Sequence, residues 1–170
     1  IRELQSIGKP FVVVVNSRKP YGQEAKQVAE ELKEKYHVST MTANCEQLRE
    51  EDIHRIMEKV LLEFPISEVQ FYIPKWVEML SREHKIKEDL IAHMREILKT
   101  MSEIKDAANG IGKLESDYID EAKVDAIEMD SGCVKIRIQI GNRYYYEMLS
   151  DMTGMDITSE YELVRTMKEM

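Results

Sequence analysis

Two short polar segments follow two strand-like stretches near the start of the chain. Asn16–Lys19 comes directly after Phe11–Val15, and Asn44–Cys45 comes directly after Val38–Ala43. In open α/β sheets the ligand crevice lies at the carboxyl ends of the strands. These segments therefore predict a ligand-binding site at this edge of the sheet, although the residues alone do not identify the ligand.

The elements that must position this edge follow from hydrophobic periodicity. Phe11–Val15 is a continuous apolar run, which is typical of a strand buried on both faces of a parallel sheet. Tyr21–Tyr36 carries one apolar stripe at helical spacing, and Val38–Ala43 predicts a second strand. A strand, a helix and a strand in this order form a βαβ unit with parallel strands and a right-handed crossover. A further helix is expected over Glu51–Leu62, and Pro65 ends it.

The remainder of the chain predicts an α+β unit. A strand over Val69–Ile73 ends at Pro74, which can open a helix. Apolar residues from Trp76 to Ile104 recur at helical spacing and predict a long helix with a bend near Lys85–Lys87. The later elements are a β-hairpin and two short helices, expected at Lys123–Met129 with Val134–Ile140, at Tyr144–Met152 and at Ser159–Met167.

Composition limits the classes of function. The chain has 170 residues, 43% of them apolar and 33% charged, and a formal net charge of −8. These values are typical of a soluble globular protein, and the negative charge argues against nucleic-acid binding. No apolar run approaches the roughly 20 residues that span a bilayer, and no signal peptide opens the chain. Cys45 and Cys133 are isolated, which predicts neither a disulfide nor a zinc site and favours a cytosolic protein.

One glycine-rich segment resembles a phosphate-binding loop only superficially. Gly110–Lys113 would need a glycine at Ala107 and a hydroxyl residue at Leu114 to match G-x-x-x-x-G-K-[ST]. The segment also follows a predicted helix instead of a strand. It is therefore predicted to be an ordinary loop, and the four histidines show no metal-ligand spacing.

The segment that begins at Asn16 resembles the base-reading N-K-x-D motif of GTPase-like P-loop proteins, with Asn44–Cys45 where a later S-A loop would lie. Ser17 replaces the motif lysine and Lys19 replaces the aspartate. A carboxylate accepts hydrogen bonds from guanine, whereas a lysine only donates. We therefore predict that Asn16, Ser17, Lys19, Asn44 and Cys45 border a nucleotide base that is not selected as guanine. The alternative is a buried strand capped by an asparagine.

Most of the chain closely resembles the stage IV sporulation protein A family of endospore-forming bacteria. The resemblance is strongest from Gly8 to about Lys87. It is carried by Gly8–Pro10 with Val15–Ser17, by Val38 with Asn44–Cys45, by Glu63–Pro65 with Glu68–Val69, and by Pro74–Val77 followed by His84.

The resemblance implies a fragment of a longer ATPase. Residues 1–73 would be the C-terminal part of a P-loop NTPase-like parallel sheet (βαβα), and residues 74–170 much of a middle domain. Such proteins bind and hydrolyse ATP with Mg²⁺. The phosphate loop and magnesium ligands would lie upstream, so no catalytic or metal-binding residue, and no cofactor bound by the isolated chain, is expected.

The resemblance also implies a role and partners. Family members polymerise into the basement layer of the spore coat, in the mother-cell cytoplasm at the outer forespore membrane. Self-association, other coat morphogenetic proteins and a small amphipathic membrane anchor that binds outside this chain would be the partners. A non-catalytic protein-interaction module on a nucleotide-binding-like fold is the alternative.

The connection between the two parts of the chain is a further candidate site. Pro65 and Pro74 restrict the backbone on either side of a short strand, and Trp76 follows within two residues. We predict that Phe64, Pro65, Pro74 and Trp76 couple nucleotide-driven changes in the ATPase part to the middle part. The alternative is that Trp76 is an ordinary core residue of the second unit.

Overall fold

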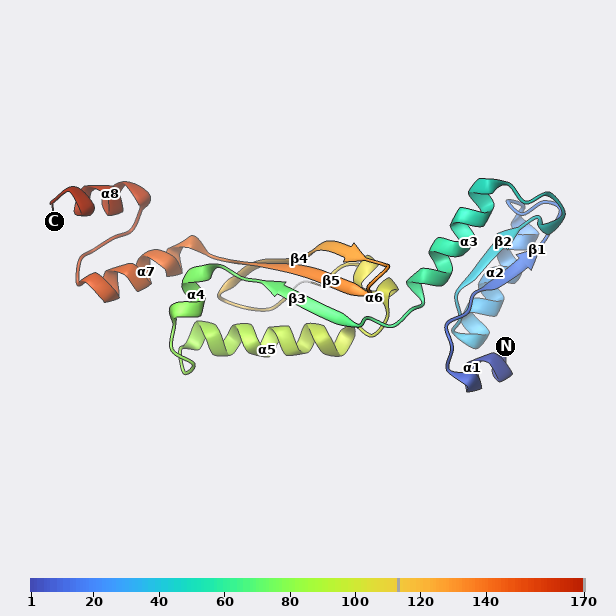
Figure 1. Ribbon diagram of the computed structural model, residues 1–170, viewed down its shortest axis with the longest axis horizontal. Coiled ribbons are helices and arrows are strands. Elements are labelled where there is room, and N and C mark those ends of the chain that lie inside the picture. The colour runs from blue at the N-terminus through green and yellow to red at the C-terminus, as the bar shows by residue number, and fades with distance from the viewer. Residues whose placement is uncertain (113, 170) are drawn as a thin grey trace. The chain divides into compact units, whose positions relative to one another are not determined.

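The computed structural model describes residues 1–112 and 114–169, which divide into two units (Figure 1). Unit 1 consists of three separate segments of the chain, Ile1–Glu68, Ser102–Asn109 and Ile127–Cys133. Unit 2 consists of Val69–Met101, Gly110–Ala126 and Val134–Met170. Residues 110–112 have no regular secondary structure, and Lys113 of the predicted loop lies outside the described residues.

Unit 1 contains the predicted βαβ element. Strands β1 (Val13–Asn16) and β2 (Thr40–Ala43) pair in parallel, with Val13 opposite Thr40 and Asn16 opposite Ala43. Helix α2 (Gln23–Tyr36) connects them and buries Ala25 and Ala29. The other elements of the unit are α1 (Arg2–Ile7), the 3-10 helix η1 (Cys45–Gln47), α3 (Glu50–Leu62) and α6 (Ile104–Ala108). The parallel, helix-connected pair confirms the α/β prediction.

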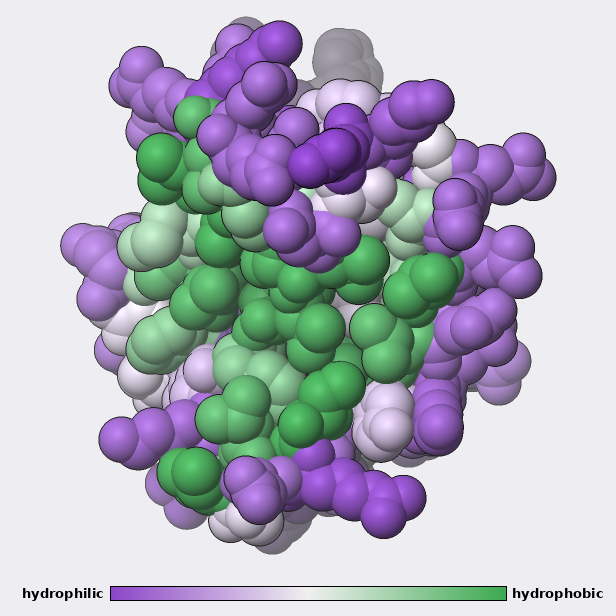
Figure 2. Space-filling model, turned by 90° about the vertical axis from the view of Figure 1, so that its right-hand side faces the viewer, coloured by the Kyte–Doolittle hydropathy of each residue, from purple (hydrophilic) through white to green (hydrophobic). Residues whose placement is uncertain are grey.

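The burial of β1 differs from the prediction. Val13, Val14 and Val15 are only half-buried, whereas the sequence predicts a strand covered on both faces. The sheet that contains them has two strands, and so few strands offer little area on which helices can pack. Figure 2 looks onto unit 1 and shows a broad area of apolar residues with hydrophilic residues around it.

Hydrogen bonds join the distant segments of unit 1. Pro65 forms a β-bridge with Glu103, and the Nζ of Lys105 bonds Glu63 Oε2 at 2.8 Å. Glu63 also accepts a hydrogen bond from the hydroxyl of Ser39. Burial alone lowers the pKa of Lys105, but its bonds to Glu103 and Glu63 outweigh burial and raise that pKa. The end of α3 is thus held to both the start of β2 and α6.

Unit 2 is built around a mixed three-stranded sheet with the order β3-β5-β4. These strands are β3 (Glu68–Tyr72), β4 (Ile119–Glu128) and β5 (Cys133–Ile140). Strands β4 and β5 form the predicted hairpin, and Figure 1 shows β3 running in the same direction as β5. Val134, Ile136, Ile138 and Ile140 are all buried, whereas Arg137 and Gln139 are exposed, which confirms the alternation that the sequence predicts.

The long helix expected from Trp76 to Ile104 is wrong, because the structure breaks it. Helix α4 (Lys75–Met79) ends at Leu80, and α5 (Lys85–Thr100) begins after His84. The ring of His84 caps α5, since its Nδ1 accepts the backbone N–H of Ile86 at 3.3 Å. Leu80 and Leu90 are both buried. The regular spacing of apolar residues therefore arises because the residues on both sides of the break are buried in a core. It does not indicate a continuous helix.

Two helices complete unit 2, α7 (Asn142–Thr153) and α8 (Glu160–Glu169). Gly154 ends α7 in the left-handed conformation, as expected from the sequence. At the start of α8 the Glu162 carboxylate accepts the backbone N–H of Thr158 at 2.7 Å, while Ser159 Oγ accepts the N–H of Glu162 at 3.4 Å. No helix among the described residues combines the length and the apolarity needed to cross a lipid bilayer.

The hairpin turn predicts a sensitive position in unit 1. A Cβ at Gly132, whose φ is +68°, would lie 2.9 Å from Ser67 Oγ and 3.3 Å from the Ser67 nitrogen. Gly8 has a similar φ of +70° but open space around it. We expect Gly8→Ala to lower the free energy of unfolding by about 1–2 kcal/mol through backbone strain alone. Gly132→Ala should cost more, as measured by denaturant unfolding, and equal losses would contradict the steric argument.

A histidine in unit 2 predicts a pH dependence. His93 places Nδ1 2.9 Å from the Asp89 carbonyl and Nε2 3.3 Å from the Glu115 carbonyl. Burial alone lowers the pKa of His93, but these two carbonyls and the Asp89 charge together raise it.

A raised pKa stabilises the folded state fully below the ordinary value of about 6.5, and this contribution is lost as pH rises through the raised pKa. We expect the free energy of unfolding to decline over that interval, with the ring titration followed by NMR. His93→Gln should flatten this part of the profile, because a glutamine side chain cannot take up the proton.

Candidate functional site

The carboxyl ends of β1 and β2 bring the predicted base-binding residues together in unit 1. Asn16 Oδ1 accepts the backbone N–H of Cys45 at 3.0 Å, and the N–H of Ser17 donates to the Ala43 carbonyl at 3.0 Å. The loop after β1 is therefore fastened to the loop after β2. Parallel strands end at the same edge of a sheet, so an asparagine directly after β1 lies beside the loop that follows β2.

The hydrogen bond to Cys45 determines what Asn16 can offer a ligand. A carboxamide has one acceptor oxygen and an NH₂ group with two donors. Since the oxygen of Asn16 already accepts from the backbone, its NH₂ group remains to donate to an acceptor such as a purine ring nitrogen. Asn44 is used differently, because its Oδ1 accepts the N–H of Glu46 at 3.1 Å and caps η1.

Ser17 and Lys19 shape the loop that follows β1. The backbone N–H of Lys19 donates to Ser17 Oγ at 3.2 Å, which closes a local turn. The side chain of Lys19 is exposed, so it adds positive charge and donors to the rim. Arg18 lies 3.8 Å from Glu46, but both side chains are largely exposed and the pair stabilises little.

A cavity of about 200 Å³ lies beside these loops, and sequence reasoning missed part of its lining. The missed side chains are Tyr21, Arg49 and Arg55, which come from the starts of α2 and α3. Arg55 bonds the Tyr21 hydroxyl at 2.9 Å, lies 5.8 Å from the centre of its ring, and pairs with Asp52. In a βαβ unit each helix begins at the edge where the preceding strand ends, and that topology could have pointed to them.

Asp52 and Arg55, two charged groups of this cavity, are paired with each other. The pKa of Asp52 is lowered, first because its carboxylate accepts the backbone N–H of Arg49 at 3.1 Å and further because Arg55 bonds it. The pKa of Arg55 is raised, with the Tyr21 hydroxyl as the main cause. We name these parts together the strand-end site, which comprises Asn16–Lys19, Tyr21, Asn44–Cys45, Arg49, Asp52 and Arg55.

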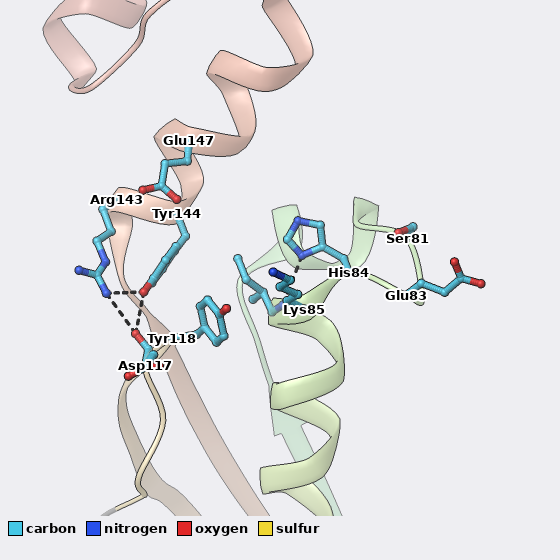
Figure 3. Close-up of a pocket in the computed structure, with 10 residues that line it drawn as sticks. Ser81, Glu83, His84, Lys85, Asp117, Tyr118, Arg143, Tyr144 and Glu147 are labelled. Atoms are coloured by element: carbon cyan, nitrogen blue, oxygen red, sulfur yellow. Dashed lines mark hydrogen bonds between the residues drawn. The ribbon is translucent and has the colours of Figure 1, made fainter.

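A larger cavity of about 840 Å³ lies in unit 2 and was not predicted from the sequence (Figure 3). Its aromatic wall consists of Tyr118 and Tyr144, whose ring centres are 5.0 Å apart in an edge-to-face contact. Arg143 lies 4.5 Å from the centre of the Tyr144 ring, and the Tyr144 hydroxyl donates to the Asp117 carbonyl at 2.7 Å. His84 and Lys85 line the opposite side, as Figure 3 shows.

The residues predicted to couple the two parts are divided between the units. Phe64 and Pro65 belong to unit 1, whereas Pro74 and Trp76 belong to unit 2. Pro74 is the residue before α4, and Trp76 packs on α7 with its ring centre 5.9 Å from that of Tyr145. The proposed coupling role stays a prediction.

The bond between Asn16 and Cys45 can be tested by substitution. Asn16→Ala removes the acceptor, and we expect faster hydrogen exchange at the Cys45 amide and a loss of about 0.5–1.5 kcal/mol in unfolding free energy. Asn16→Asp keeps an acceptor oxygen and should retain most of the protection, measured by NMR. Equal exchange in both variants would show that this bond does not hold the loops together.

Two family models together match the whole chain. Residues 1–65 match the family model described as "Stage IV sporulation protein A, ATPase domain", and residues 66–170 match "Stage IV sporulation protein A, middle domain". No solved structure matches the chain.

Curated relatives match along nearly the whole chain. A Clostridioides difficile protein named stage IV sporulation protein A is 34% identical over 165 residues, which are 96% of this chain and 34% of the relative. A Bacillus subtilis protein of the same name is 29% identical, covering 99% of this chain and 35% of the relative. The chain thus spans about a third of the length of these relatives. With family models matching both parts, the chain belongs to the stage IV sporulation protein A family.

Proposed function

We propose that this chain forms the base-binding end of an ATP-hydrolysing protein that polymerises into the basement layer of the bacterial spore coat. The observation that carries the proposal is the fastening of Asn16 to Cys45 at the carboxyl ends of β1 and β2. It leaves the Asn16 NH₂ group as a fixed donor at the edge where α/β sheets bind ligands. The match of residues 1–65 to an ATPase domain supports a nucleotide as the ligand.

The strand-end site offers groups that can bind a base, whereas the sequence holds no phosphate-loop motif for a triphosphate. Asn16, Lys19 and the tyrosine and arginines of the cavity offer donors and an aromatic face, and Asp52 and Glu46 are engaged with arginines. The sequence contains no G-x-x-x-x-G-K-[ST] pattern. In this proposal the phosphate loop and the Mg²⁺ ligands come from polypeptide outside these 170 residues.

The cellular setting is part of the same proposal. The protein would act in the mother-cell cytoplasm at the outer forespore membrane, associate with itself and with other coat morphogenetic proteins, and be held there by a small amphipathic membrane protein. The family name, which refers to sporulation, supports this setting. Phe64, Pro65, Pro74 and Trp76 would transmit the nucleotide state to the middle domain.

A second candidate function is a non-catalytic interaction module. The half-buried strand β1 and the exposed apolar residues of α3, Ile53 and Met57, favour it because they offer surface to another polypeptide. A module of this kind would use the nucleotide-binding topology without binding nucleotide.

The relative affinities for ATP and GTP distinguish the two candidate functions. We expect a chimera, in which this chain replaces the matching segment of the Clostridioides difficile relative, to bind ATP with no strong preference for GTP. Lys19→Asp supplies a carboxylate that can accept hydrogen bonds from guanine and should shift the ratio of affinities at least tenfold toward GTP in competition titrations.

Lys19→Ala is the matched control, since it removes the ammonium group without adding an acceptor, and it should leave the ratio near that of the parent chimera. A folded chimera that binds neither nucleotide would favour the interaction module. A parent chimera that already prefers GTP tenfold would show that Lys19 does not face the base.

A further inference from the structure

The cavity of about 840 Å³ in unit 2 lies where three elements begin. Its lining comes from residues 81–86 at the start of α5, residues 117–118 before β4 and residues 143–147 of α7. All of these residues belong to unit 2. The volume lies within the range of roughly 300–1,000 Å³ that is usual for small-molecule sites. The cavity therefore has room for a small organic ligand.

The aromatic wall of this cavity is held in place by its own contacts. The Tyr144 hydroxyl donates to the Asp117 carbonyl at 2.7 Å, and the Arg143 guanidinium donates to the same carbonyl at 3.2 Å. Arg143 also lies over one face of the Tyr144 ring, and Tyr118 meets that ring edge to face. The buried side chain of Ile86 adds aliphatic surface. An aromatic ring of a ligand can pack on such a wall in the edge-to-face or offset-stacked arrangements that rings prefer.

Charges of opposite sign face the cavity from its two sides. Lys85 stands at the start of α5, and Glu147 stands across the cavity on α7 (Figure 3). Among the described residues, neither side chain forms an ion pair. Asp117 and Arg143, both on the side of α7, carry charges of opposite sign, and Figure 3 shows Glu83 extending away from the tyrosines. One ammonium group and one carboxylate thus remain available on opposite sides.

His84 adds a hydrogen-bond donor beside Lys85. Its Nδ1 accepts the backbone N–H of Ile86 at 3.3 Å, so the neutral ring carries its proton on Nε2. In the part of the chain that the structure describes, this Nε2 has no acceptor. An ammonium group and an imidazole N–H together can bind a carboxylate through charge-assisted hydrogen bonds. The α5 side therefore suits the carboxylate of a ligand, and the α7 side suits its ammonium group.

We propose that this cavity binds a free amino acid with an aromatic side chain. Lys85 and His84 bind its carboxylate, and Glu147 binds its ammonium group. Tyr118 and Tyr144 contact its ring. A ligand with only one charge would leave the opposite side of the cavity without a partner, whereas a zwitterion engages both sides. The site consists of residues of unit 2 and needs no nucleotide, so it is independent of the proposed function.

Isothermal titration calorimetry of the chain with three probes tests the two charges. The probes are L-phenylalanine, its N-acetyl derivative, which lacks the ammonium group, and its amide, which lacks the carboxylate. At a pH of about 6.5, where an α-amino group is charged, we expect L-phenylalanine to bind with a Kd of about 1 mM or below. Each derivative should bind at least about tenfold more weakly, because it lacks one of the two charged contacts.

Two substitutions assign the charged contacts to side chains. Lys85→Met removes the ammonium group, and we expect it to abolish the preference for L-phenylalanine over its amide. Glu147→Gln removes the negative charge and should abolish the preference over the N-acetyl derivative. Both side chains are exposed, so neither substitution should unfold the chain. Lys99→Met, at the other end of α5, is the matched control and should leave both preferences unchanged.

Other results would overturn the proposal. Equal binding of L-phenylalanine and its N-acetyl derivative would indicate a site for anions, and equal binding of L-phenylalanine and its amide would indicate a site for cations. Absence of binding by all three probes, in a chain whose NMR spectrum shows that it is folded, would exclude the site. Preferences that Lys85→Met and Glu147→Gln leave unchanged would place the ligand elsewhere.

Discussion

The parallel pairing of β1 with β2 is the constraint on which the candidate site depends. Parallel strands require a crossover, and α2 supplies it, so both strands end at one edge and both following loops begin there. Asn16 then spans the two loops by accepting the N–H of Cys45. Pairing, not the individual polar residues, gives the strand-end site its geometry, because the same side chains on a disordered loop would have no fixed direction.

The apolar side chains of the two units are buried to different extents. In unit 2 every second residue of β5 is buried, and α5 adds Ile86, Leu90 and Ile97 to the same core. In unit 1 the apolar strand is half-buried, and the buried residues of α2 are two alanines. Apolar surface that stays in contact with water contributes little to the free energy of folding. Unit 1 therefore stands to gain more stability than unit 2 from an apolar neighbour.

Local periodicity explains which predictions succeeded. The βαβ element and the hairpin follow from patterns that extend over a few consecutive residues, such as Val134–Ile140. The sequence indicated only a bend near Lys85, and the full break was not predicted because it depends on His84, whose ring caps a helix in place of the usual serine or aspartate. The cavity with Tyr118 and Tyr144 could not be predicted, since it joins side chains 26 positions apart that no pattern relates. The partial burial of β1 depends on the number of strands in its sheet, which the sequence of one strand does not report.

Unit 1 is assembled from three stretches of chain, and this has a consequence for biosynthesis. Its bridge between Pro65 and Glu103, and the contact of Ser67 with Gly132, join residues that leave the ribosome far apart in time. At roughly 5–20 residues per second, several seconds separate synthesis of the βαβ element from arrival of the turn at Gly132. During that interval the end of α3 and the residues that follow it lack their contacts with the later segments.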